Sequence, residues 1–141
     1  MIKEYVFNKA VSMGACALYT GKEDMNELAR LFFTPQGQEF CVNHNFPDYP
    51  TFQMLKSDEF EQEGIYIDED VRLANKAKVG LIGDTYAELV YTDPNKRHEV
   101  ILMYGAKAKI VARDWAVVFV TNAGGGEVVC DADDTAKIMM L

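Results

Sequence analysis

The chain has 141 residues, of which 49% are hydrophobic and 11% aromatic, enough for one folded unit with a proper core. The formal net charge is −8, whereas phosphate contacts need an excess of Lys and Arg, so we expect no direct nucleic-acid binding. No stretch approaches the roughly eighteen apolar residues of a membrane helix, and the charged residues of M-I-K-E-Y-V-F-N-K disfavour a secretory signal.

The three cysteines, Cys16, Cys41 and Cys130, are widely spaced and flanked by apolar residues. An odd number with such spacing is typical of buried small hydrophobes in a reducing compartment. Together with the missing signal and the missing membrane span, the cysteines predict a cytoplasmic protein.

Residues 1–57 show the spacing of α-helices. Apolar residues recur at helical intervals in the first stretch, and Gly21 is expected as the residue that follows its end. Asp24 is expected to cap a second helix, which Pro35 and Gly37 end.

A short helix is expected through residues 40–42, followed by an extended turn at F-P-D-Y-P, residues 46–50. Thr51 is expected to cap the last short helix of this part of the chain. Residues 58–64 read as an acidic connector, either a solvated link or a frayed helix end. The predicted helical cap subdomain therefore covers residues 1–57.

From residue 65 onward the hydrophobic period drops to two, as in β-strands. A phrase of a small residue, a charged residue and an aliphatic run recurs at steps of 8 to 11 residues. Three copies are A-K-V-G-L from Ala77, A-K-I-V-A from Ala108 and A-K-I-M-M from Ala136. Such self-similarity predicts equivalent strands separated by turns.

Alternation assigns the strand residues to two faces. One face is almost wholly apolar and is expected to form the core; it includes Val79, Leu81, Leu89, Tyr91, Val100, Leu102, Ile110, Ala112, Val118, Val120, Val128, Cys130, Ile138 and Met140. The opposite face also carries apolar residues, namely Val90, Ile101, Val111, Phe119 and Val129. A solvated face rarely carries so many, so we expect a covering element or a partner there.

Two other features extend this candidate interaction surface. Trp115, the only tryptophan, lies at a strand entrance and is expected either as an exposed binding anchor or as a packed corner residue. The last repeat, A-K-I-M-M-L, carries no polar capping segment, which leaves an expected strand edge or open coil end.

Two architectures use strands at ten-residue spacing, a β-solenoid and an antiparallel meander or small barrel. The recurring small residue and the absence of two-residue Asn-Gly or Asp-Gly turns favour the solenoid. Charge does not decide between them. A meander would set Glu88 beside Glu99, and a coil of three strands would stack Lys78, Lys109 and Lys137. The prediction is an α+β protein in which the helical cap precedes a short right-handed β-solenoid, residues 65–141, within one cooperative domain.

Residues 65–141 resemble the short single-stranded β-helix proteins, including the bactofilin type, whose strands repeat a similar phrase. With the stretch F-C-V-N-H-N-F-P at residues 40–47, the chain is similar to small uncharacterised β-helix proteins of Bacteroidetes and their phages or mobile elements. The chain departs from bactofilins in its substantial helical N-terminus and very short solenoid. The resemblance implies a fold and a tendency to assemble, and it transfers no active site.

Cys41 and His44 have the C-x-x-H spacing that could ligate zinc or form a nucleophile–base pair. A structural zinc site needs about four ligands, and the only further soft candidates are Cys16 and His98. No orienting residue or oxyanion loop is visible for a nucleophile. We therefore expect neither a catalytic residue, nor a metal, nor a cofactor.

Acidic residues cluster near the end of the repeats at Asp131, Asp133 and Asp134. Paired carboxylates can bind calcium or act on a polysaccharide, but these lack the spacing of an EF-hand loop. We expect them to be solvated turn residues.

The leading functional hypothesis is a non-enzymatic structural or interaction protein that self-associates through the solenoid. The alternative is an acidic binding module, such as a phage-encoded inhibitor, that binds a basic protein partner. A small carbohydrate-active β-helix protein is the third hypothesis. A homo-oligomer or a complex with a protein partner is expected, without nucleic acid or membrane.

Overall fold

The computed structural model describes residues 2–15 and 20–141 of the chain. The chain divides into two compact units, Met1–Glu63 and Gly64–Leu141. We call the first the helical unit and the second the solenoid unit.

The described part of the helical unit contains five helices. They are α1 (Ile2–Ser12), α2 (Met25–Phe32), α3 (Pro35–His44), α4 (Tyr49–Leu55) and α5 (Asp58–Gln62). Their core is aromatic: the Phe32 ring meets Phe33 and Phe52 edge-on, with centroids 5.2 and 5.9 Å apart. Phe60 is also buried, so the stretch expected as an acidic connector contributes a core residue.

The predicted cap at Asp24 is confirmed. The Glu27 N–H donates to Asp24 Oδ1 at 2.8 Å, and the Asp24 N–H donates to Glu27 Oε1 at 3.3 Å. This reciprocal capping box satisfies backbone donors that the first turn of α2 leaves open.

Three of the other expected helix limits were wrong. α1 ends at Ser12, and its first left-handed glycine is Gly14, with φ 90°, rather than Gly21. Pro35 begins α3 instead of ending α2, because proline suits the first helical position, whose N–H needs no partner. α4 is capped by Asp48, whose carboxylate accepts the Thr51 N–H at 2.9 Å.

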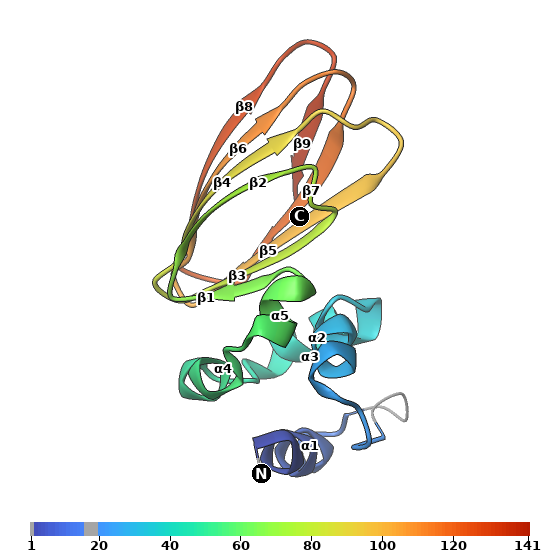
Figure 1. The fold of residues 1–141 in the computed structure, drawn as a ribbon, viewed down its shortest axis with the longest axis vertical. Helices are drawn as coiled ribbons and strands as arrows, with labels where there is room; N and C mark the ends of the chain where they lie inside the picture. Colours follow the sequence, from blue (N-terminus) through green and yellow to red (C-terminus); the bar gives the residue numbers. More distant parts are fainter. Residues whose placement is uncertain (1, 16–19) are drawn as a thin grey trace. The chain divides into compact units, whose positions relative to one another are not determined.

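The solenoid unit is built from nine strands in two parallel sheets (Figure 1). The five-stranded sheet contains, in spatial order, β1 (Ile65–Ile67), β3 (Lys78–Ile82), β5 (Arg97–Met103), β7 (Val117–Asn122) and β9 (Lys137–Met140). The four-stranded sheet contains β2 (Asp70–Ala74), β4 (Tyr86–Tyr91), β6 (Lys107–Ala112) and β8 (Glu127–Ala132).

Consecutive strands alternate between the two sheets, so each coil consists of two strands and nine strands give about four turns. Lys107 lies beside Glu127, which follows it by 20 residues, and Tyr86 lies beside Lys107, which follows it by 21. Every strand pair is parallel. The β-solenoid prediction is therefore confirmed, and the antiparallel alternative is wrong.

The two-strand coil also corrects the expected stacking of three lysines. Lys78 lies beside Glu99, and Glu88 lies between Arg72 and Lys109. Arg72 Nε is 3.2 Å from Glu88 Oε2. Opposite charges on neighbouring strands are mildly stabilising, so the outer charges agree with the observed register.

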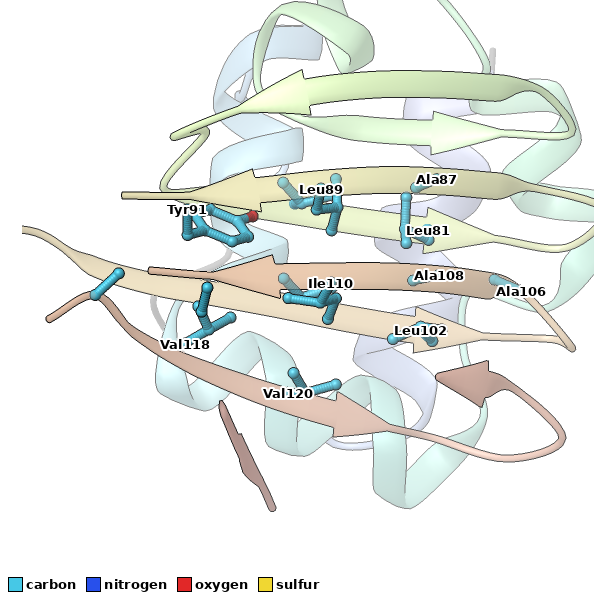
Figure 2. Close-up of a cluster of buried hydrophobic side chains, with 14 of the residues drawn as sticks. Leu81, Ala87, Leu89, Tyr91, Leu102, Ala106, Ala108, Ile110, Val118 and Val120 are labelled. Atoms are coloured by element: carbon cyan, nitrogen blue, oxygen red, sulfur yellow. The ribbon is translucent and has the colours of Figure 1, made fainter. Parts of the chain in front are cut away.

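Residues at the same register position on neighbouring strands of a sheet form a column. The inward side chains of successive strands stack along these columns and fill the interior of the solenoid (Figure 2). Leu81, Leu89 and Ile110 are at most 1% exposed. The small residues of the repeat lie near the corners, where Ala87, Ala106 and Ala116 are fully buried. A larger side chain at these corners would collide with the packed interior.

One corner of the interior is polar. His98 is fully buried and its Nε2 lies 2.9 Å from the Asp93 carbonyl oxygen. Its ring lies against that of Tyr91, with centroids 4.5 Å apart. Burial raises the pKa of the Tyr91 hydroxyl, which stays protonated in the fold.

Two valines of the solenoid unit provide a matched test of this core. Val118 is 0% exposed and Val90 is 40% exposed. Val118→Ala should lower the free energy of unfolding by about 1.5–3 kcal/mol, because buried apolar surface is lost and a cavity remains. Val90→Ala should change it by no more than about 0.5 kcal/mol. Urea unfolding followed by circular dichroism measures both; equal losses would contradict this assignment of the faces.

Candidate interaction surface

The coil formed by β8 and β9 leaves core positions open to solvent. Val79, Val100, Val120 and Met140 occupy one inward column on four neighbouring strands. The three valines are 0% exposed, whereas Met140 is 51% exposed. The apolar interior of the solenoid is therefore uncovered at this coil, which we call the open coil (residues 127–141).

The second sheet shows the same change. Leu89, Ile110 and Cys130 share an inward column on β4, β6 and β8. Leu89 and Ile110 are buried, but Cys130 is exposed. Thus both sheets present residues of the interior pattern at the open coil.

The backbone edges of the open coil are also unpaired by any described strand. β8 is hydrogen-bonded to β6 only, and β9 to β7 only. A free strand edge presents a row of N–H and C=O groups that can pair with another strand. The open coil thus combines an apolar interior with two free edges.

The outward apolar residues differ from one another in exposure. Val129 is 61% exposed and Val90 is 40% exposed, whereas Val111 and Phe119 are half-buried. Ile101 is only 3% exposed, so it offers no free contact area. Met139, which the strand alternation also assigns to the outward face, is 45% exposed.

Phe119 has a partner within the solenoid unit. The guanidinium carbon of Arg97 lies 4.1 Å from the centroid of the Phe119 ring. This cation–π contact covers part of the ring and lies on the outer surface of neighbouring strands.

Trp115 lies at the corner between β6 and β7 and is 68% exposed. Asp114 and Trp115 both have positive φ, 57° and 68°, and the Ala116 N–H donates to the Arg113 carbonyl at 3.1 Å. The Trp115 N–H donates to Thr135 Oγ1 at 3.2 Å, which ties this corner to the next coil. The exposed side chain is at odds with a packed corner residue, and a binding role for Trp115 stays a prediction.

The Cys41–His44 spacing does not assemble a reactive pair. Cys41 is buried in α3, and burial raises the pKa of its thiol to about 12. His44 is exposed, and its ring lies 4.5 Å from that of Phe40. Cys16 lies outside the described residues.

No group of three His, Cys, Asp or Glu side chains in the described part of the chain is placed to hold a metal ion. The clustered aspartates instead have local roles. Arg113 Nη2 lies 3.1 Å from Asp131 Oδ2, and Asp133 Oδ1 accepts the Thr135 hydroxyl at 2.6 Å. This hydroxyl and the Thr135 N–H lower the pKa of Asp133, which remains ionised while it holds the turn before β9. Asp134 is exposed in the same turn.

No protein-family model, no curated protein and no solved structure matches this chain. None of the described helices has the length and apolar character needed to cross a membrane. The open coil is thus a candidate interaction surface because of its exposed apolar residues and its strand edges.

Thiol labelling tests the assignment of Cys41 as a packing residue. At about pH 8, iodoacetamide should modify Cys130 in the folded protein well before Cys41, because Cys130 is exposed and Cys41 is buried with a raised pKa. Peptide mapping by mass spectrometry separates the two sites. Unfolding in urea should bring Cys41 to the rate of Cys130, and equally fast labelling of both in the native protein would show a reactive thiol in α3.

Proposed function

We propose that the solenoid unit is a non-enzymatic interaction element through which copies of this chain associate. The observation that carries the proposal is the change along one inward column, from 0% exposure at Val120 to 51% at Met140. In this column the three positions before Met140 are shielded from solvent, and a contacting surface would restore the burial of Met140.

The chemistry of the open coil supports a protein partner. Val129, Met139 and Leu141 are 61%, 45% and 70% exposed and, like Met140, belong to the open coil. Full burial of one such side chain stabilises a complex by about 1.5–3 kcal/mol before the cost of association. Methionine also adapts its shape to a partner surface. A patch of this kind is typical of an interface.

Two further expectations from the sequence, the resemblance to a known type of β-helix protein and the cytoplasmic location, belong to the same proposal. The resemblance to bactofilin-type β-helix proteins agrees with assembly and adds no site residue. The isolated cysteines agree with a cytoplasmic location.

Light scattering over a dilution series tests self-association. We expect the molar mass to rise above that of one chain as the concentration increases. Val129→Glu should raise the dissociation constant at least about tenfold, because it places an unpaired charge in the interface. A mass of one chain at every concentration would contradict the proposal.

Val90→Glu is the matched control for this test. Val90 is an outward valine of the same sheet, 40% exposed, but it lies on β4, away from the open coil. It should leave the dissociation constant unchanged if the open coil is the interface. An equal effect of both variants would place the contact on the outer face of the sheet, and circular dichroism establishes that each variant is folded.

A further inference from the structure

We infer that two copies meet end to end at their open coils, with β9 of each copy paired antiparallel to β8 of the other. This inference rests on the proposed self-association and adds the partner strand, the register and the symmetry. Its basis is the fit between the faces and charges of β8 and β9.

The geometry of the solenoid allows two symmetric end-to-end arrangements. Consecutive strands run in opposite directions on two sheets, as Figure 1 shows. A two-fold axis perpendicular to the sheets pairs β8 with β8 and β9 with β9. A two-fold axis parallel to the strands pairs β8 with β9 on both sheets. Both close the interface and give a dimer.

Continuity of the interior fixes the register of a β8–β9 pair. Directly opposed residues of an antiparallel pair point to the same face, so inward residues must oppose inward residues. The register that pairs all of β9 sets Ile138 beside Cys130 of the second copy, and Met140 beside Val128 of the second copy. Both apolar columns then continue from one copy into the other.

The outward residues agree with the same register. Met139 comes to lie beside Val129 of the second copy, and Lys137 beside Asp131 of the second copy. The two most exposed outward apolar groups of these strands thus cover each other, and a cation meets an anion. Two-fold symmetry forms each of these contacts twice.

Pairing like strands is less favourable. Two registers of a β8–β8 pair oppose inward residues, and both overlap over five residues. One sets Glu127 beside Asp131 of the second copy, and like charges directly opposed on neighbouring strands are destabilising. The other sets Val129 beside Asp131 of the second copy, which leaves Val129 without an apolar partner.

Head-to-tail stacking meets a similar obstacle. Asp70 aligns with Tyr86, Tyr86 with Lys107 and Lys107 with Glu127 along the columns of the four-stranded sheet. Continued in this register, β8 would set Glu127 beside Asp70 of the next copy. Such stacking would also give an open-ended filament rather than a dimer.

Both β8–β9 pairs can form at once. An axis parallel to the strands relates the two pairs by symmetry, so both have the same register. The axis also keeps each residue at its position along the strand, so paired residues must lie at similar positions across one coil. The turn between β8 and β9 covers residues 133–136, so Cys130 and Ile138 are within one residue of being equidistant from it.

Disulfide capture tests the register. Ile138→Cys should form an intermolecular disulfide with Cys130 under mild oxidation, because directly opposed residues of antiparallel strands lie at about 4.5–5.5 Å between Cα atoms. A bond within one chain is disfavoured by the spacing of about 10 Å between facing sheets. Met140→Cys is the matched control, an inward residue of the same strand that would oppose Val128 of the second copy. Non-reducing electrophoresis and peptide mapping identify the bond.

A charge exchange provides an independent test that leaves the interior unchanged. Lys137→Glu should raise the dissociation constant roughly 2- to 30-fold, as expected for two exposed ion pairs. Asp131→Lys also breaks the ion pair of Asp131 with Arg113 of the same copy, so this single variant is measured as well. The double variant should associate more tightly than either single variant. Lys109→Glu, on β6 beside Val129, is the control and should leave the dissociation constant unchanged.

The outcomes separate the inference from the proposed function. A monomer at every concentration overturns both. A dimer that cross-links in the unmodified protein between two Cys130 residues, or equally well with Met140→Cys, keeps self-association and overturns the β8–β9 pairing. A dimer without rescue by Asp131→Lys also overturns the pairing, and a mass that grows without limit shows head-to-tail stacking instead.

Discussion

The solenoid unit depends on one constraint: a coil of two short strands cannot bury its own inward side chains and needs a neighbouring coil to cover them. The column from Val79 through Val100 and Val120 shows the constraint satisfied, since each valine is 0% exposed. Stability in such a stack is mainly a sum over neighbouring coils. A coil with a neighbour on one side only is the place where this sum is incomplete, and the open coil is such a place.

The same constraint explains the placement of polar groups. Charged side chains lie on the outer surface, where Arg72 and Glu88 pair across neighbouring strands at 3.2 Å. Asparagine and aspartate lie at corners that need positive φ or extra acceptors: Asn75 has φ 55° and its side chain accepts the Thr92 N–H at 2.8 Å. The interior is thereby left mainly to small and aliphatic residues, and the buried exceptions include Tyr66, Thr85, Tyr91 and His98.

Much of the fold could be predicted because its causes are local. Asp24 and Glu27 have the capping-box spacing, and the strand alternation separates inward from outward residues. The number of strands in a coil could not be predicted in this way. A ten-residue phrase indicates one strand, but it does not indicate which later strand lies beside it. The exposure of outward residues is similarly non-local: Val90 and Ile101 occupy like places in the phrase, yet one is 40% and the other 3% exposed. α4 begins at Tyr49 and is capped by Asp48, three residues before the expected cap Thr51. This earlier start is possible because proline is tolerated in the first turn of a helix, where Pro50 lies.

The regular step between coils also defines how the gene could change length. Neighbours on β5 and β7, on β6 and β8, and on β7 and β9 are each separated by 20 residues. Duplicating or deleting one whole step, such as residues 107–126, would keep every inward side chain inward and every corner at a corner. A single inserted residue within a strand would instead turn the rest of that strand over. Variation in the height of this solenoid is therefore expected to be discrete, with the coding length of one coil as its unit.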